Sequence, residues 1–214
     1  VYFINMGSSE RKAREKAELR RRIIAAGTEV VSREGHEHLT IRKVAAAVEY
    51  SPRTIYLHFE DKEDLMRAIV EAGFERTLAA RRAAPRDPSL TAEERARGRL
   101  RAHIDAALAD PNFYRAVVAI LMTTHYPPGP AQQAVIAEAR NDLQELSAQQ
   151  HEDEPHGSDQ VEADMMIVFA TLRGFTRSLL TITDQLTAAQ REQLIENFIE
   201  YTIAGIRRTH IKRR

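Results

Sequence analysis

Residues 39–65 read LTIRKVAAAVEYSPRTIYLHFEDKEDL, and this stretch decides the fold. Thr40 can accept a hydrogen bond as the N-cap of a short helix whose apolar residues recur at helical spacing. These apolar residues are Ile41, Val44, Ala45 and Val48. Ser51 and Pro52 supply a second N-cap followed by proline at the first helical position, which predicts another short helix through about His58. Two short helices separated by a three-residue break are typical of a helix-turn-helix.

A longer helix is expected before this motif, from about Glu10 to Glu34. Its apolar face recurs with the helical period at Leu19, Ile23, Ala26 and Val30. Gly35 then stands where a glycine that ends a helix is favoured. Residues 1–9 lack this periodicity and are expected to be disordered or carried over from upstream, with Met6 as the natural start.

The side chains on the outer face of the second short helix indicate what this helix binds. Ile55 and Phe59 lie four residues apart and are expected to pack inward on the first short helix. The side chains left for the outer face are Arg53, Thr54, Tyr56 and His58. Because the major groove of DNA admits one α-helix, Arg53 suits a guanine edge or a phosphate, and Thr54 suits a thymine methyl group. Tyr56 and His58 suit phosphates. The alternative is a three-helix domain that uses its aromatic residues as core and binds proteins.

The order T-I-Y-x-H-F-x-x-K-x-x-L from Thr54 to Leu65, behind one long helix, resembles the signature of the TetR family of transcriptional regulators. The resemblance covers roughly Arg20–Ile69. It implies an all-α chain with a helix-turn-helix DNA-binding domain at residues 10–60 and a ligand-binding and dimerisation domain at residues 61–214. The implied DNA contacts are Arg42, Pro52, Arg53, Thr54, Tyr56, Leu57, His58 and Lys62. The N-cap residues Thr40 and Ser51 are expected to contact DNA as well.

Two positions within this resemblance carry their own expectations. Lys62 matches the position that binds a phosphate at the start of the fourth helix, with help from the helix dipole. Glu49 stands in the turn, where many members of the family have glycine. Because glutamate tolerates a left-handed backbone less well than glycine, the turn is expected to differ slightly from the family's geometry.

Helical patterns continue through the rest of the chain. The fourth helix, capped by Asp61, is expected to run to about Ala84 and to be followed by a hinge at Pro85–Pro88. Further helices are expected at Thr91–Ala109, Pro111–His125, Pro130–Gln150, Ser158–Thr183 and Thr187–Arg208. No stretch alternates over enough residues to predict a strand. The fold is therefore expected to be all-α, with about nine helices.

The last two expected helices carry apolar stripes wider than a surface helix needs for its own core. Ala170, Gly174 and Ser178 recur every fourth residue and make a flat strip that another helix can approach. One interpretation is a helix buried in the core of a monomer. The family resemblance favours a homodimer in which these two helices pair across a two-fold axis. A dimer also suits a palindromic operator, because one recognition helix reads only a few base pairs.

The middle helices are expected to hold a small apolar or amphipathic ligand, as the resemblance implies. Methionine and aromatic side chains with a few polar groups suit such a ligand. The expected lining residues are Phe113, Tyr114, Val117, Leu121, Met122, His125, Tyr126, Met165, Met166, Phe169 and Arg173. A charge at Arg173 in an apolar helix needs a partner, which is either a ligand carboxylate or Asp105. Ordinary core packing is the alternative for each residue.

Composition excludes several classes of protein. The chain has no cysteine, which excludes a disulfide scaffold, a thiolate nucleophile and a Cys-based zinc site. No uninterrupted apolar run is long enough to span a bilayer, so a soluble, cytoplasmic protein without a membrane partner is expected. The cluster His151–His156 indicates a solvated loop rather than a metal site. Because no catalytic motif is present, neither an enzyme nor a cofactor is expected.

The net charge of zero conceals a basic N-terminal end. Residues 1–58 carry eleven Lys or Arg against seven Asp or Glu. This excess indicates either an anionic partner such as double-stranded DNA or a solvated helix face. The combined expectation is a repressor that binds a palindromic operator as a homodimer and is released by a small-molecule inducer. The alternatives are an activator of the same family, or a helical module that binds a small molecule or a protein but not DNA.

Overall fold

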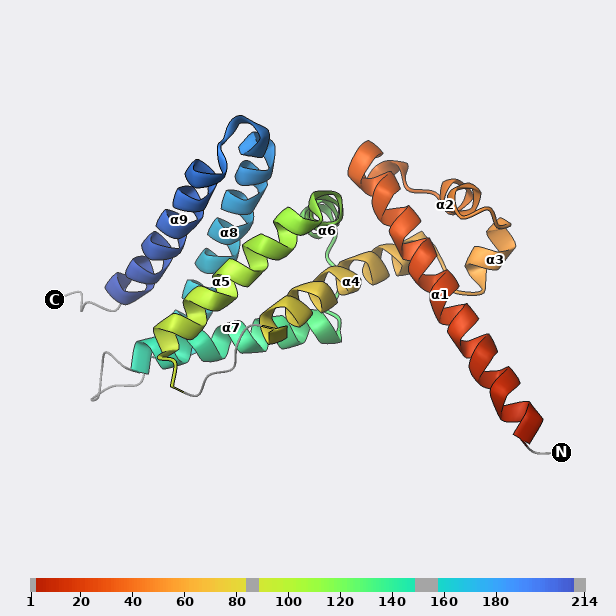
Figure 1. Cartoon of the computed structure of the whole chain (residues 1–214), viewed down its shortest axis with the longest axis horizontal. Helices are drawn as coiled ribbons and strands as arrows, with labels where there is room; N and C mark the ends of the chain where they lie inside the picture. Colours follow the sequence, from red (N-terminus) through yellow and green to blue (C-terminus); the bar gives the residue numbers. More distant parts are fainter. Residues whose placement is uncertain (1–2, 84–88, 149–157, 210–214) are drawn as a thin grey trace. The chain divides into compact units, whose positions relative to one another are not determined.

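The computed structural model of the chain describes residues 3–83, 89–148 and 158–209. Within these ranges the chain is all-α, as predicted, with nine α-helices and no strand (Figure 1). The helices are α1 (Phe3–Glu34), α2 (Ile41–Ala47), α3 (Pro52–Tyr56), α4 (Lys62–Ala83), α5 (Ala92–Ala109), α6 (Pro111–Thr123), α7 (Pro130–Ala148), α8 (Ser158–Ile182) and α9 (Ala188–Thr209). They form two compact units. The first unit comprises residues 1–73 and 112–127, and the second comprises residues 74–111 and 128–214.

The ends of α1 are set by different causes. As predicted, the helix stops before Gly35, whose backbone angles (φ 96°, ψ 157°) are accessible essentially to glycine alone. The Gly35 N–H donates to the Val31 carbonyl at 3.0 Å and closes the last turn. The prediction that the helix begins near Glu10 is wrong, because α1 begins at Phe3. Residues 3–9 contain no proline, and a helix that is already nucleated extends into such residues readily.

The core of the first unit is built from the apolar faces of its helices. Its most deeply buried side chains include Ile23, Leu39, Val44, Ile55, Phe59, Leu65, Ile69 and Ile120. Ile55 and Phe59 turn inward, as predicted, with at most 1% of their surface exposed. At Gly27 in α1, an added Cβ would lie 3.1 Å from Ile69 Cδ1 in α4. The absence of a side chain at Gly27 therefore lets α1 and α4 pack closely.

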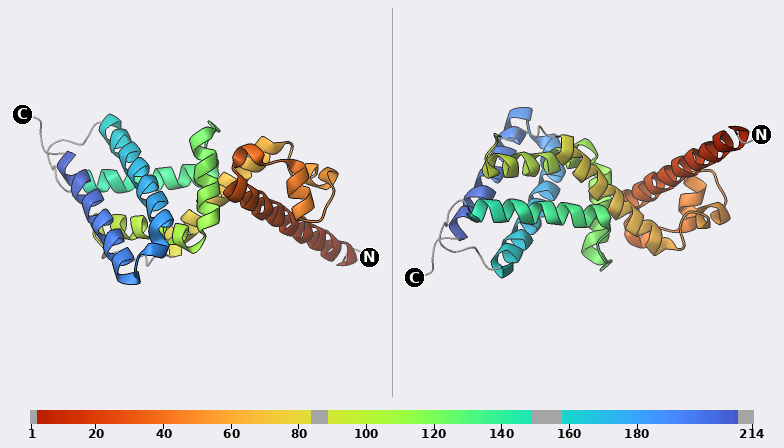
Figure 2. Two further views of the ribbon diagram at one scale, coloured as in Figure 1. Left: turned by 90° about the horizontal axis from the view of Figure 1, so that it is seen from above. Right: turned by 90° about the horizontal axis from the view of Figure 1, so that it is seen from below.

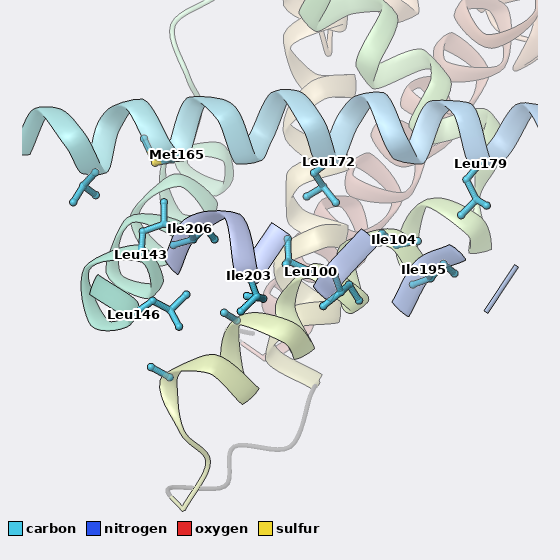
Figure 3. Packing of buried hydrophobic residues seen from close by; sticks show 14 residues of the cluster. Leu100, Ile104, Leu143, Leu146, Met165, Leu172, Leu179, Ile195, Ile203 and Ile206 are labelled. Atoms are coloured by element: carbon cyan, nitrogen blue, oxygen red, sulfur yellow. The ribbon is translucent and has the colours of Figure 1, made fainter. Parts of the chain in front are cut away.

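A separate core lies in the second unit, where α5, α7, α8 and α9 contribute aliphatic side chains (Figure 3). The labelled members are Leu100, Ile104, Leu143, Leu146, Met165, Leu172, Leu179, Ile195, Ile203 and Ile206. α5 begins with a capping box, since Thr91 Oγ1 accepts from Glu94 N at 3.2 Å and the Glu94 carboxylate accepts from Thr91 N at 2.8 Å. An ion pair between Arg101 and Glu196 at 3.1 Å joins α5 to α9.

α8 and α9 lie side by side within the second unit (Figures 1 and 2). By length and composition alone α8 could cross a membrane, because an 18-residue window within residues 159–185 has a mean hydropathy of 1.3. However, Leu172 and Leu179 are buried in the second core, and Arg173 and Arg177 interrupt the apolar run. α8 is therefore a core helix of a soluble protein.

Two predicted connections cannot be compared with this architecture. The expected hinge Pro85–Pro88 and the loop His151–His156 lie outside the described residues. The described helices on either side of them begin and end within a few residues of the predicted bounds.

Candidate nucleic-acid interface

Local hydrogen bonds define the starts of α2 and α3. The Thr40 side chain accepts from Lys43 N at 3.2 Å and caps α2. Ser51 Oγ accepts from Thr54 N at 3.2 Å and caps α3, with Pro52 in the first turn. Both predicted N-caps are confirmed. Because each cap satisfies a backbone N–H that the helix itself leaves unpaired, the two helices start at fixed residues.

The turn between α2 and α3 contains a strained glutamate. Glu49 has φ 61°, in the left-handed region. Glu49 N donates to the Ala46 carbonyl at 3.2 Å, and Tyr50 N donates to the Ala45 carbonyl at 3.0 Å. This pair of bonds forms a Schellman motif, which usually has glycine at the left-handed position. The expected departure from glycine-like geometry is therefore wrong, because the two hydrogen bonds hold Glu49 in the conformation that glycine would adopt.

α3 has a polar, exposed outer face opposite its buried side. Ile55 has no exposed surface, whereas Arg53 is exposed and Tyr56 and Leu57 are 55% and 70% exposed. The other exposed members of the expected contact set are Thr40, Arg42, Ser51 and Pro52. The half-buried members are Thr54, His58 and Lys62. None of the ten side chains is buried in the core, and all belong to the first unit.

His58 is held in a partly buried, electropositive position. Burial lowers the pKa of His58, and the nearby Lys16 and Arg20 lower it further. Its Nδ1 atom is buried and has no hydrogen-bond partner in the described part of the chain. The imidazole is therefore neutral near pH 7 and can offer a hydrogen bond rather than a positive charge to a phosphate.

Lys62 lies at the start of α4, as predicted. Asp61 Oδ1 accepts from Asp64 N at 2.6 Å, which caps the helix. The Lys62 ammonium donates to the Glu37 carbonyl at 3.3 Å and remains only half-buried. A cation beside a helix N-terminus is a suitable position for a phosphate, although the first-turn carboxylates of Glu63 and Asp64 oppose this attraction.

Two arginines of the basic N-terminal end have structural roles. Arg20 stacks over the Phe59 ring with its Cζ atom 4.2 Å from the ring centroid, and its Nη1 donates to the His58 carbonyl at 3.1 Å. Arg22 Nη2 donates to the Val48 carbonyl at 3.2 Å. These contacts join α1 to the C-terminal end of α2 and to the residues that follow α3. Sequence reasoning missed them because the partners lie 26 and 38 residues further along the chain.

The expected ligand residues fall into two groups, and those of α6 and the segment after it belong to the first unit. Phe113 and Val117 are buried against α4, where a Cβ added at Gly73 would lie only 2.6 Å from Val117 Cγ2. Tyr126 lies against Arg67, whose Cζ atom is 5.6 Å from the ring centroid. Burial raises the pKa of Tyr126, and Glu63 raises it further. The half-buried members are Tyr114, Leu121 and Tyr126, and the exposed members are Met122 and His125.

The second group lies in α8, within the second unit. Met165 and Phe169 line a cavity of about 40 Å³ together with residues of α4, α5, α7 and α9. Met166 is 68% exposed and points away from this core. Arg173 is half-buried, and its Nε donates to the Phe169 carbonyl at 3.2 Å. Of the eleven expected ligand residues, two therefore line this cavity.

The suggested partnership between Arg173 and Asp105 is wrong. Both Asp105 carboxylate oxygens accept from Arg101 Nε, at 3.0 and 2.9 Å. Arg101 lies four residues before Asp105 on α5, and residues at this spacing are neighbours on one helix face. The sequence signal for this nearer pairing was present.

α8 and α9 expose large apolar side chains. Met166, Ile167 and Tyr201 are 68%, 56% and 77% exposed. A groove of about 280 Å³ runs between these helices, lined in part by Ile167, Tyr201 and Gly205. A Cβ added at Gly174 or Gly205 would meet no atom within 4 Å. The small-residue strip predicted for α8 is exposed as well, because Ala170, Gly174 and Ser178 all face solvent.

The described residues contain no group of three or more His, Cys, Asp or Glu side chains placed to hold a metal ion.

Sequence comparison places the α2–α3 motif among known regulators. Residues 23–69 match the family model described as bacterial regulatory proteins, tetR family. Over 74 residues the chain is 36% identical to the HTH-type transcriptional regulator TcmR of Streptomyces glaucescens. The aligned stretch is 35% of this chain and 31% of TcmR, so the chain spans about a third of the length of this curated relative.

Structural comparison extends over both units. The fatty acid degradation regulator FadR of Bacillus halodurans is 15% identical, with a TM-score of 0.65 over 86% of this chain and 94% of FadR. A tetR-family regulatory protein of Rhodococcus RHA1 is 22% identical, with a TM-score of 0.62 over 87% and 96%. SCO7222, a TetR from Streptomyces coelicolor, is 19% identical, with a TM-score of 0.62 over 89% and 98%. At these identities the similarity shows a common fold.

Proposed function

The chain belongs to the TetR family of transcriptional regulators, which are not enzymes, and from this premise we propose that it is a repressor. In this proposal a homodimer binds a palindromic DNA operator and is released by a small apolar or amphipathic ligand. The observation that carries the proposal is the exposed polar face of α3, fixed at its start by the Ser51 cap and anchored by buried Ile55. The protein acts in the cytoplasm, where its operator is accessible.

The residues of the α2–α3 region divide between reading bases and binding phosphates. Arg53 is exposed near the N-terminal end of α3, where its planar guanidinium can donate two hydrogen bonds to one guanine. Lys62 binds a backbone phosphate at the start of α4, which positions the protein without reading sequence. Neutral His58 donates a hydrogen bond to the DNA backbone, and Leu57 adds an apolar contact to the DNA.

The exposed apolar face of α8 and α9 supports the homodimer. Exposed side chains as large as Ile167 and Tyr201, gathered on two adjacent helices, are typical of a surface that is covered by another protein. A two-fold axis would place the same face of a second copy against it, so each residue of this face occurs twice in the interface, once from each copy. The dimer then presents two copies of α3 to the two halves of a palindrome.

The inducer acts through α4 in this proposal. Residues 62–73 of α4 belong to the first unit and residues 74–83 to the second. A ligand that binds more tightly to a conformation with a different position of α4 shifts the protein away from the DNA-binding state. The operator affinity then falls by the ratio of the ligand's affinities for the two states.

The test is selection of genomic DNA fragments by the purified full-length protein at about physiological salt, where non-specific contacts are weakened. We expect a short palindrome to be enriched, and transcription from a promoter that carries it to fall when the protein is present. The variants Arg53→Glu and Lys62→Glu should abolish enrichment, whereas Arg82→Glu, which reverses an exposed charge in the second unit, should not. Enrichment of no sequence, even after unfolding and refolding to remove a bound ligand, would refute DNA reading. Increased transcription would instead identify an activator.

A further inference from the structure

Arg81 is a buried cation with incomplete hydrogen bonding. Its side chain is only 5% exposed, in the part of α4 that belongs to the second unit. Its Nη1 lies 3.6 Å from Glu138 Oε2 and 3.5 Å from the Val135 carbonyl, both at or beyond the limit of a good hydrogen bond. Its Nε is buried and has no hydrogen-bond partner in the described residues. Burial of a cation without good partners is costly, so Arg81 has spare capacity for an anion.

The cavity of about 40 Å³ is lined in part by Arg81. Arg81, Arg99 and Asp142 form its polar part, and Arg99 is already ion-paired with Asp142. The remainder is apolar and includes Leu100, Leu143, Leu146, Met165, Phe169 and Leu172, several of which are labelled in Figure 3. The cavity therefore joins one poorly paired cation to a wall of aliphatic and aromatic side chains.

The charged side chains that line the cavity are two cations, Arg81 and Arg99, and one anion, Asp142. Arg81 and Arg99 face the carboxylates Glu138 and Asp142, but Arg173 makes no ion pair with a described carboxylate. His103 does not add to or balance this charge. Burial, together with the nearby charges of Arg81 and Arg173, lowers the pKa of His103 to about 4, so the imidazole is neutral at pH 7. An entering anion meets a positive surrounding field.

We propose that the inducer is an apolar carboxylate, and that its carboxylate binds Arg81 in place of Glu138 while its apolar body lies among the side chains of α5, α7 and α8. This inference rests on the proposed function only in treating the ligand as an inducer. The existing cavity has room for a carboxylate group. The apolar body displaces flexible side chains, and Met165, with its unbranched thioether, adapts most easily.

Glu138 is the residue that makes the proposal specific. Its carboxylate keeps Arg81 charged and partly satisfied in the empty protein, but the distance of 3.6 Å is that of a weak pair. Its side chain is 30% exposed, so it can be solvated when a ligand carboxylate takes its place. The ligand and Glu138 thus compete for one guanidinium group. Removing the negative charge of Glu138 should therefore increase the affinity of the ligand.

The experiment measures binding of two apolar carboxylates to the full-length protein by calorimetry at pH 7. Decanoate and 2-naphthoate are the probes, and 1-decanol and 2-naphthol are their neutral counterparts. We expect at least one carboxylate to bind about tenfold or more tightly than its neutral counterpart, as a charge-assisted hydrogen bond allows. Equal binding within both pairs, or no binding of either carboxylate, would overturn the proposal.

Three variants test the role of Arg81. Arg81→Met should reduce carboxylate affinity to that of the neutral probe, whereas Arg82→Met, on the exposed face of the same helix, should leave it unchanged. Glu138→Gln should increase carboxylate affinity several-fold. Because misfolding cannot increase affinity, this variant remains informative even if Arg81→Met unfolds. Unchanged or weaker binding to Glu138→Gln would contradict the proposed competition.

The binding measurement needs no DNA, so its failure is distinguishable from failure of the proposed function. If the protein enriches a palindrome but shows no preference for carboxylates, the proposed function is supported and the carboxylate site is refuted. If it prefers carboxylates but enriches no DNA sequence, the carboxylate site is supported and the repressor function is refuted. Release of operator DNA by the preferred carboxylate supports both.

Discussion

The two units of the molecule leave opposite kinds of side chain uncovered. The first unit exposes Arg53 and Tyr56 on α3 and buries Ile55 beneath them, which is the ordinary distribution for a soluble protein. The second unit exposes Ile167 and Tyr201 and buries Arg81, which inverts that distribution. The distribution of exposed and buried side chains therefore says little about what the first unit binds. In the second unit, the exposed apolar side chains and the buried arginine each indicate a missing binding partner. For the first unit, the helix-turn-helix motif in the sequence indicates the partner instead.

The largest expected effect is loss of the dimer when the exposed apolar face is charged. Ile167→Glu would place one carboxylate from each copy in the proposed two-fold interface. We expect the dimer dissociation constant to rise about 1000-fold, from roughly 4 kcal/mol of lost interaction. Analytical ultracentrifugation measures the change, and operator affinity should fall with it.

The matched control for this substitution is Ala137→Glu, which adds the same charge to an exposed position of α7 in the same unit. It should leave sedimentation unchanged. A dimer that survives Ile167→Glu would show that the α8–α9 face is covered by something other than a second copy.

Acid should destabilise the second unit through its buried histidine. His103 keeps some exposed surface, but its Nε2 is buried. Because its pKa is about 4 in the folded chain and about 6.5 when unfolded, the unfolded chain binds more protons between these values. The contribution of His103 to the free energy of unfolding is thus fully present above pH 6.5 and falls by about 3 kcal/mol on acidification to pH 4.

Urea titrations at pH 7, 5.5 and 4 measure this loss. His103→Gln should flatten the acid limb, whereas His38→Gln, at an exposed position of the first unit, should not. If His103→Gln loses stability toward pH 4 as steeply as the parent chain, buried His103 is not the source of the acid sensitivity.

Arg53→Ala should reduce base discrimination in the first unit. Loss of a bidentate contact to guanine costs about 1–3 kcal/mol, and the loss should be restricted to one base pair of each half-site. Competition between the operator and operators changed at single positions measures it.

Lys62→Ala should weaken binding to all DNA sequences alike. It should reduce the slope of log affinity against log salt by about one for each lost phosphate contact. The lost hydrogen bond to the Glu37 carbonyl adds a small effect on stability. Equal changes in salt slope for Arg53→Ala and Lys62→Ala would remove the proposed division between base reading and phosphate binding.

The smallest effect concerns the turn of the first unit. Glu49→Gly should increase the free energy of unfolding by about 1 kcal/mol, because glycine adopts the left-handed backbone without a steric penalty. Glu49→Ala keeps that penalty and serves as the control in the same denaturant titration. A similar gain for alanine would show that removal of the carboxylate, rather than relief of the backbone, stabilises the chain.

Features that depend on nearby residues were predictable from the sequence. The caps Thr40 and Ser51 and the glycine that ends α1 act within three or four residues, so the sequence contains the whole interaction. The polar face of α3 was also predictable, because it follows from helical periodicity and the buried positions of Ile55 and Phe59.

Features that depend on distant partners were not predictable. The pairing of Arg20 with Phe59 and the His58 carbonyl joins segments 38 and 39 residues apart, which no local pattern records. Periodicity also cannot distinguish a face that packs into the core from one that packs on another protein. Met165 and Met166 are adjacent and equally apolar, yet one is 5% and the other 68% exposed.

The close approach of α6 to Gly73 has a consequence for how this protein can vary. An added methyl group at residue 73 would fall 2.6 Å from Val117 Cγ2 and 3.2 Å from Phe113 Cε1. The space at position 73 is thus already occupied by the side chain at position 117, and the two positions share a single volume. A larger residue can enter α4 there only together with a smaller one in α6, so substitutions at these two positions are compensatory and neither can be judged alone.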